Sequence, residues 1–138
     1  MSEIPAAILS AYLETDYHVF SEPPFALRIK QPSEPLANLF RQYKTSCAAF
    51  LTACNPFSRK LDDAANAERQ VELAKELTQR GRSFIEGEGR HPSGNWAEPS
   101  YLVLGLSLDE AKKLGRQFEQ NAIVWCGADT VPELVLLR

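Results

Sequence analysis

Cysteine and histidine are scarce in this sequence, and their scarcity excludes several kinds of chemistry. The 138 residues include three cysteines, Cys47, Cys54 and Cys126, and two histidines, His18 and His91. No CxxC pair and no Cys/His cluster has the spacing of a zinc site, so we expect no metal. An odd number of scattered cysteines predicts reduced thiols and a cytoplasmic protein rather than a disulfide framework.

The signatures of several functional classes are also missing. The sequence has no GxGxxG, GxxxxGK[ST] or GxSxG motif, and we expect no cofactor. The net charge of −3 and the pI of about 5.4 disfavour general nucleic-acid binding, which needs a basic excess. No apolar run approaches the ~18 residues of a membrane span, and the acidic start without a basic region predicts no signal peptide and no membrane association.

What is present is the composition of an ordinary globular domain. Hydrophobic residues make up 44% of the chain and charged residues 24%. A chain of 138 residues is long enough to bury a core without a disulfide or a metal. Because we find no repeat, linker or low-complexity tract, we expect a single domain over residues 1–138.

Hydrophobic periodicity predicts a mixture of helices and strands. We predict helices over about 3–15, 33–43, 62–80 and 108–118, and strands over 17–20, 25–30, 47–53, 82–87, 101–106, 122–126 and 133–137. The runs 47–53 and 101–106 are apolar throughout, which is typical of central strands. Ser33 and Ser107 can cap the helices that follow them, and Gly81 can end the third helix. The Gly/Pro-rich segment 87–96 is predicted to be a loop.

The order of these elements predicts an α+β fold. From 47 to 126 it is β-α-β-β-α-β, the ferredoxin-like split β-α-β arrangement, preceded by a helix-hairpin-helix extension and followed by an extra C-terminal strand. The first and third strands of this core then lie in the middle of the sheet. Helical-wheel and strand patterns predict that the following side chains are buried: Phe50, Leu73, Leu77, Val103, Ala111, Leu114 and Phe118.

The same topology gathers polar residues at one rim of the sheet, where a ligand site is expected. Asn55, Asn66 and Asn121 would orient a small polar ligand through hydrogen bonds. Arg69 would hold an anionic group, and Trp96 would stack on the ligand. The segments that meet there are 52–56, 66–69, 91–98 and 120–121.

Glu98 and His91 are the candidate catalytic residues. Pro99 holds Glu98 in extended backbone at the mouth of a central strand, where burial would raise the pKa of its carboxyl group. The alternative is an Arg69–Glu98 ion pair that pins the hairpin. His91 would lie in a flexible loop. Cys54, from the segment 52–56, either pairs with His91 as a thiol dyad or is a buried, inert thiol.

Two functions remain open at this point. The first is binding of a small polar ligand at the rim, with or without acid–base chemistry, so that enzymatic activity is undecided. The second is a non-enzymatic protein-interaction or regulatory module. In that case Asn66 and its neighbours would brace the loop 54–65, and an apolar patch or sheet edge would bind a partner protein or a second copy.

Four motifs taken together resemble a known family. They are TACNP at 52–56, Asn66 with Arg69, GNWAEPS at 94–100 and FEQNA at 118–122. As a set they are similar to the bacterial domain-of-unknown-function family 3293, and the resemblance covers nearly the whole chain. It implies a small, single-domain bacterial protein and brings no established activity, cofactor or catalytic residue.

Overall fold

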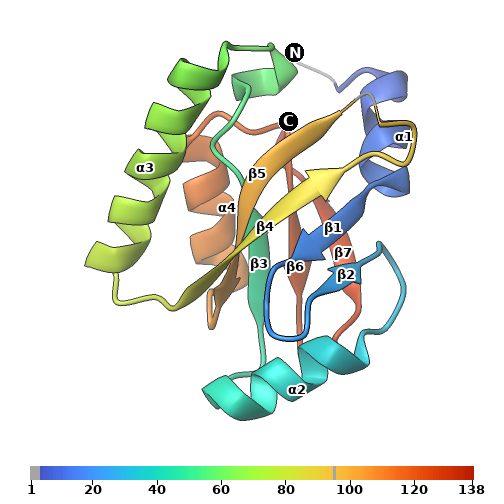
Figure 1. Cartoon of the computed structure of the whole chain (residues 1–138), viewed down its shortest axis with the longest axis vertical. Coiled ribbons are helices and arrows are strands. Elements are labelled where there is room, and N and C mark those ends of the chain that lie inside the picture. Colours follow the sequence, from blue (N-terminus) through green and yellow to red (C-terminus); the bar gives the residue numbers. More distant parts are fainter. Residues whose placement is uncertain (1–3, 95) are drawn as a thin grey trace.

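A computed structural model describes residues 4–94 and 96–138, in which four α-helices pack on one seven-stranded sheet (Figure 1). The helices are α1 (Ala6–Glu14), α2 (Glu34–Tyr43), α3 (Asp63–Gln79) and α4 (Leu108–Gln117), and a short 3-10 turn, η1, covers Pro56–Ser58. The strands are β1 (Asp16–Val19), β2 (Phe25–Leu27), β3 (Ala48–Leu51), β4 (Phe84–Arg90), β5 (Ala97–Leu104), β6 (Ala122–Cys126) and β7 (Pro132–Leu136). The α+β class is therefore as predicted.

The helix ends follow the capping residues in the sequence. Ser33 accepts a hydrogen bond from the Leu36 N–H, and Ser107 accepts one from the Glu110 N–H, which confirms both predicted caps. After α3 the chain leaves the helix through Gly81, whose φ of +70° is the left-handed conformation that glycine adopts without strain. α1 begins at Ala6 rather than at residue 3, which lies outside the described residues.

The sheet is antiparallel, and its strand order is β2-β1-β4-β5-β3-β6-β7. The two continuous apolar runs form β3 and β5, which pair with each other in the interior of the sheet as predicted. β3 is buried at every residue and the last three residues of β5 are buried too, which explains the continuous apolar runs. β5 runs from Ala97 to Leu104 rather than over 101–106, and its first half alternates between exposed and buried residues. The N-terminal hairpin, whose placement the sequence left open, extends the sheet by pairing β1 with β4.

The predicted loop over 87–96 is wrong in its first half, because β4 continues through it to Arg90. A Cβ atom on Gly87 would lie 2.2 Å from the His18 carbonyl oxygen of β1. Gly87 therefore allows β1 to approach closely within a strand, although in a sequence a glycine indicates a turn.

The sheet separates two apolar clusters. One face packs against α2 through Leu36, Leu39 and Phe40, and α1 lies at the opposite end of the sheet from α2 (Figure 1). The other face packs against Leu73 and Leu77 of α3 and against α4. Of the seven predicted core residues, Phe118 is only partly buried, because it lies at the end of α4, and the other six are buried as predicted.

The two outer edges of the sheet approach each other. β2 ends at Leu27 rather than at residue 30, and Lys30, at φ +68°, donates its N–H to the Pro132 carbonyl at 2.8 Å. Ser33 N–H similarly reaches the Thr130 carbonyl at 3.2 Å. The sheet is therefore curled, and its concave face is the one that α1 and α2 cover.

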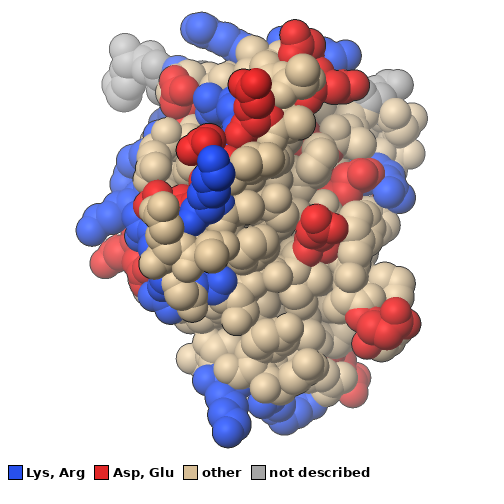
Figure 2. All heavy atoms as spheres, turned by 60° about the vertical axis from the view of Figure 1, so that its left-hand side comes forward, with Lys and Arg blue, Asp and Glu red and all other residues tan. Residues whose placement is uncertain are grey.

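Charged side chains of both signs are interspersed on the α3 side of the molecule (Figure 2). They form local ion pairs, such as Lys75 with Glu72 and Arg82 with Glu110. Among the helices that the structure describes, none combines the length and the apolar composition needed to cross a bilayer.

Candidate functional site

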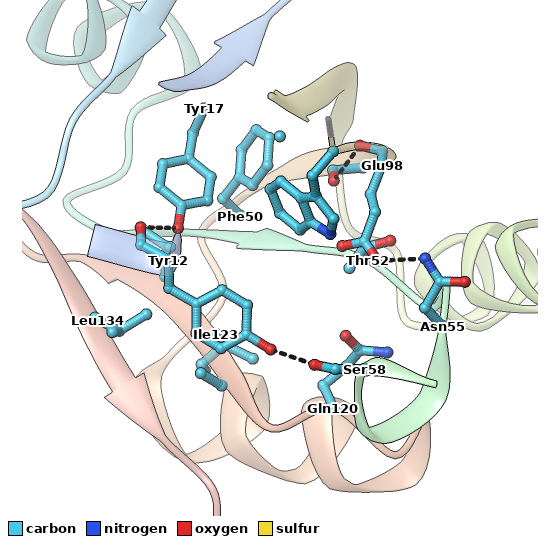
Figure 3. A pocket seen from close by; sticks show the side chains of 15 residues that line it. Tyr12, Tyr17, Phe50, Thr52, Asn55, Ser58, Glu98, Gln120, Ile123 and Leu134 are labelled. Carbon is cyan, nitrogen blue, oxygen red and sulfur yellow. Dashed lines mark hydrogen bonds between the residues drawn. The ribbon is translucent and has the colours of Figure 1, made fainter. Parts of the chain in front are cut away.

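A cavity lies between α1 and the concave face of the sheet (Figure 3). Tyr17, Phe50 and Val124 supply its apolar wall from three different strands. Polar side chains complete the lining of the cavity at Thr52, Asn55, Ser58, Glu98, Ser100 and Gln120. The lining residues lie far apart in the sequence, from Tyr12 to Leu134. The curl of the sheet brings them around one space.

Glu98 is the carboxylate of this cavity. It lies in β5 with only 8% of its surface exposed, and Oε2 accepts a hydrogen bond of 2.7 Å from Asn55 Nδ2 (Figure 3). Burial raises the pKa of Glu98 from 4.5 to about 7, and the Asn55 hydrogen bond acts in the opposite direction. Glu98 can therefore give up or take on a proton near neutral pH.

Two asparagines fix the hydrogen bond to Glu98. Asn55 N–H donates to Asn66 Oδ1 at 2.9 Å, and Asn66 Nδ2 donates back to Asn55 Oδ1 at 2.9 Å. Leu61 N–H donates to the same Asn55 oxygen at 2.9 Å. Since Asn55 Oδ1 accepts two hydrogen bonds, the NH₂ end of this amide is the end that faces Glu98. These contacts match the predicted bracing role of Asn66 in the loop.

A second hollow lies on the other side of this pair, beside α3. Cys54, Asn66 and Gln70 line it, together with Asn55 and Glu98. The Asn55–Glu98 hydrogen bond is therefore part of the wall between the two spaces.

Four aromatic residues line the cavity. The rings of Tyr12 and Trp96 lie 6.5 Å apart at 59°, and Tyr17 packs edge-on against Phe50 at 5.2 Å. The Tyr12 hydroxyl contacts Ser58 Oγ at 2.8 Å, and Figure 3 shows this contact closing one side of the space. Tyr12 is thus the side chain through which α1 covers the site.

Arg69 was predicted to bind an anionic group or to pair with Glu98, and its hydrogen bonds go elsewhere. Nε donates to the Ala53 carbonyl at 2.6 Å, and Nη2 donates to the Phe118 carbonyl at 2.5 Å. Its ion pair is with Glu119 at 3.4 Å, and the described residues contain none between Arg69 and Glu98. Arg69 therefore joins the end of β3 to the end of α4.

Asn121 and His91 lie outside the cavity and the second hollow. The buried Asn121 donates to Ser58 Oγ at 2.8 Å and accepts from Arg138 Nη1 at 2.9 Å. His91 Nδ1 lies 2.7 Å from Ser93 Oγ, and its Nε2 lies 3.9 Å from Glu14. Both side chains are held by contacts at the margins of the site.

Cys54 is buried, and burial raises the pKa of its thiol. Its Sγ lies 3.8 Å from the Pro99 carbonyl, and the described contacts of His91 do not include it. The geometry fits the inert-thiol alternative. The described residues also contain no group of three or more His, Cys, Asp or Glu side chains placed to hold a metal ion.

Sequence reasoning missed several lining residues. Thr52 and Gln120 fell within the segments expected at the rim, but their roles were not assigned. Tyr12 and Tyr17 were placed only in a helix and a strand, since no local pattern marks an aromatic residue that faces a cavity. The detectable signal was weak: Tyr12 shares a helical stripe with Ile4 and Ile8.

Comparison with known proteins gives one match. The model of a family described as protein of unknown function (DUF3293) matches residues 51–123. This span contains Asn55, Glu98 and Gln120 and ends before β7, while Tyr12 and Tyr17 precede it. No curated protein and no solved structure matches the chain.

Proposed function

The chain belongs to the family of proteins of unknown function DUF3293, and we propose that it binds a small molecule under α1 and exchanges a proton with it through Glu98. The observation that carries the proposal is a buried carboxyl group in an aromatic-lined cavity, without a basic partner among the described residues. Such combinations of a concave site and a perturbed acid are typical of ligand-binding and catalytic sites.

The chemistry that fits this site is general acid–base catalysis. A carboxyl group with a pKa of about 7 is half protonated at neutral pH, so it can act as donor or acceptor without a large free-energy penalty. In this proposal Trp96 and Tyr12 contact the ligand, and Asn55 holds the carboxylate. Asn66 acts through Asn55 as a positioning residue.

Three residues of the expected site have no ligand contact in this proposal. The polar atoms of Arg69 and Asn121 are hydrogen-bonded to protein groups, and His91 lies on the β4–β5 turn. A ligand reaching Arg69 would first have to displace two backbone carbonyl contacts. The interaction-module alternative keeps these residues in purely structural roles.

The test is a ligand screen by thermal shift on the wild-type protein, on Glu98→Gln and on Glu86→Gln. Glu86 lies on the neighbouring strand β4 and is exposed, so it controls for the loss of one carboxylate. A compound that binds the native state raises the melting temperature. We expect hits whose shift disappears in Glu98→Gln and persists in Glu86→Gln. Hits that respond equally to both substitutions, or a screen without hits, would contradict the proposal.

We further propose two assignments that complete this picture. The order β4-β5-β3-β6 within residues 47–126 supports a ferredoxin-like core to which the hairpin and β7 were added. The free thiols of Cys47, Cys54 and Cys126 support residence in the reducing cytoplasm.

A further inference from the structure

Three hydroxyl groups that line the cavity already donate their hydrogens to carbonyl groups of the protein. Thr52 donates to the Pro99 carbonyl at 2.7 Å, and Ser100 donates to the Glu98 carbonyl at 3.1 Å. The Tyr17 hydroxyl donates to the Tyr12 carbonyl at 2.7 Å. Because a hydroxyl has one hydrogen and two lone pairs, each of these groups can offer a ligand an acceptor and no donor.

The two amide hydrogens of Gln120 are also donated to carbonyl groups of the protein. Its Nε2 donates to the Cys54 carbonyl and to the Phe118 carbonyl, both at 3.1 Å. These two bonds use both hydrogens of the amide, so Oε1 remains as an acceptor. Together with the carboxylate of Glu98, the buried end of the cavity thus presents oxygen acceptors from several directions.

The electrostatic character of the cavity agrees with this inventory. Among the described residues that line it, Glu98 is the one carboxylic acid, and none is Lys, Arg or His. The faces of Tyr12, Trp96 and Phe50 supply the negative end of aromatic quadrupoles, which attract cations. An anionic ligand would face the Glu98 carboxylate and the oxygen acceptors of the lining, and no positively charged side chain of the lining would balance its charge.

We propose that the cavity accepts a small organic cation rich in N–H donors, such as an amine, amidine or guanidine, with its charged end toward Glu98 and Gln120. This inference rests on the proposed function and names its ligand class. One hydrogen of the Tyr12–Ser58 hydroxyl pair is not used between them, and it would meet the outer end of the ligand, where an acceptor atom is acceptable. Two further donors belong to the lining, the second hydrogen of Asn55 Nδ2 and the Trp96 indole N–H, and they would meet an acceptor atom of the ligand rather than its charged end.

Binding of such a cation is coupled to the proton on Glu98. The titratable groups that face this carboxyl are Tyr17 of β1 and Cys54 after β3, and burial raises both pKa values, so both stay protonated at neutral pH. Below the pKa of Glu98, its proton must leave before the cation binds. The affinity for a permanently charged guanidinium should therefore fall toward a limit of tenfold per pH unit as the pH decreases.

The experiment compares ethylammonium, ethanol and acetate, which share a two-carbon skeleton and differ in charge and donors, with methylguanidinium as a second cation; small probes are chosen because the cavity volume is about 50 Å³. Binding is followed by NMR at the side-chain amide of Gln120 and the indole N–H of Trp96. At pH 8 we expect a cation to bind at least tenfold more tightly than the alcohol or the carboxylate. Glu98→Gln should remove this preference, and the matched control Glu86→Gln should retain it.

The pH series provides a second measurement on the same sample. Wild-type protein and Glu98→Asp, which keeps a carboxylate, should lose affinity for methylguanidinium at low pH, and Glu98→Gln should bind weakly at every pH. The NMR spectrum of each variant also reports whether it is folded. If Glu98→Gln is unfolded, the pH series and the cation preference of the wild-type protein still test the proposal.

The outcomes separate the ligand class from the proposed function. Tighter binding of ethanol or acetate in the cavity would overturn the cation proposal and leave the ligand site standing. If no cation perturbs the cavity signals while the thermal-shift screen yields Glu98-dependent hits of another class, the cation proposal also fails alone. If that screen yields no such hit either, both proposals fail.

Discussion

At the scale of single residues, Glu98 makes stability depend on pH in an unusual direction. Its pKa is about 7 in the folded protein and 4.5 in an ordinary exposed setting. Between these values the folded state holds a proton that the unfolded chain has lost, so the free energy of unfolding falls as pH rises through this window. A carboxylate that is paired with a base shows the opposite behaviour.

Glu98→Gln should remove this pH dependence, because a glutamine resembles the protonated acid at every pH. At pH 5 we expect the variant to be close to wild type in stability. At pH 8 it should be more stable by up to about 3 kcal/mol, from ~1.4 kcal/mol per unit of pKa shift. Urea unfolding at the two pH values measures the difference. A variant that is equally destabilised at both would show that Glu98 is a structural hydrogen-bond partner.

Asn66 gives a second prediction at this scale. Asn66→Ala removes both hydrogen bonds to Asn55, whose φ of +50° is a conformation that needs such support. We expect a loss of about 1–3 kcal/mol in unfolding free energy. The pKa of Glu98, followed by carboxyl ¹³C NMR, should also rise because its Asn55 donor is no longer held. The exposed Gln79→Ala on the same helix should change neither quantity, and an unchanged pKa in Asn66→Ala would refute the positioning role.

At the scale of elements, α4 approaches the sheet through a glycine. A Cβ atom at Gly115 would lie 2.5 Å from Leu137 Cδ1 and 2.8 Å from Ile123 Cγ2. Gly115→Ala gains helix propensity of about 1 kcal/mol. Overpacking should outweigh that gain and cost about 1–3 kcal/mol. Denaturant unfolding measures the balance, with the exposed Arg116→Ala as a control, and a net stabilisation would show that α4 can move outward freely.

α1 is an apolar helix that lies at the surface of the molecule. None of its nine described residues is buried, and Leu13 is 48% exposed. We therefore expect its amides to exchange hydrogen through local opening, at a lower free energy than those of α3. A ligand enclosed beneath Tyr12 should slow this exchange. Hydrogen-exchange mass spectrometry measures both effects, and protection of α1 equal to that of α3 would contradict the expectation.

Elements could be predicted from the sequence where one local pattern dominates. The apolar runs identified β3 and β5, and Ser33 and Ser107 identified two helix starts, because burial and capping act on neighbouring residues. The prediction failed at Gly87 and its surroundings, where the reason for glycine is a carbonyl group of β1, distant in the sequence. Contacts of this kind leave no local signal.

At the scale of the whole molecule, the site illustrates the same limit. Topology predicted that Asn55, Asn66 and Glu98 lie near one rim, and Asn55 is hydrogen-bonded to both of the others. It could not assign the partners of Arg69, because a long side chain at a rim reaches several carbonyl and carboxylate groups. The contribution of Tyr12 depends on how α1 crosses the curled sheet, which is a property of the assembled fold rather than of any segment.

The final prediction concerns residues 1–138 as one domain. The two tryptophans report on opposite sides of the sheet, because Trp96 lines the cavity under α1 and Trp125 packs with the cluster beneath α3 and α4. Leu114→Ala, in the α4 cluster, should cost about 2–5 kcal/mol. If the two faces of the sheet unfold together, Leu114→Ala must shift the unfolding midpoint equally whether it is followed by Trp96 or by Trp125 fluorescence.

Single-tryptophan variants make this measurement possible. Leu114→Ala is introduced into Trp96→Phe and into Trp125→Phe, and urea unfolding is followed by fluorescence in each pair. Equal losses of unfolding free energy indicate one cooperative unit, as expected because Leu102 and Val103, adjacent in β5, belong to opposite clusters. If Leu114→Ala does not change the unfolding midpoint reported by Trp96, the cavity side unfolds independently. The single-domain proposal would then be wrong.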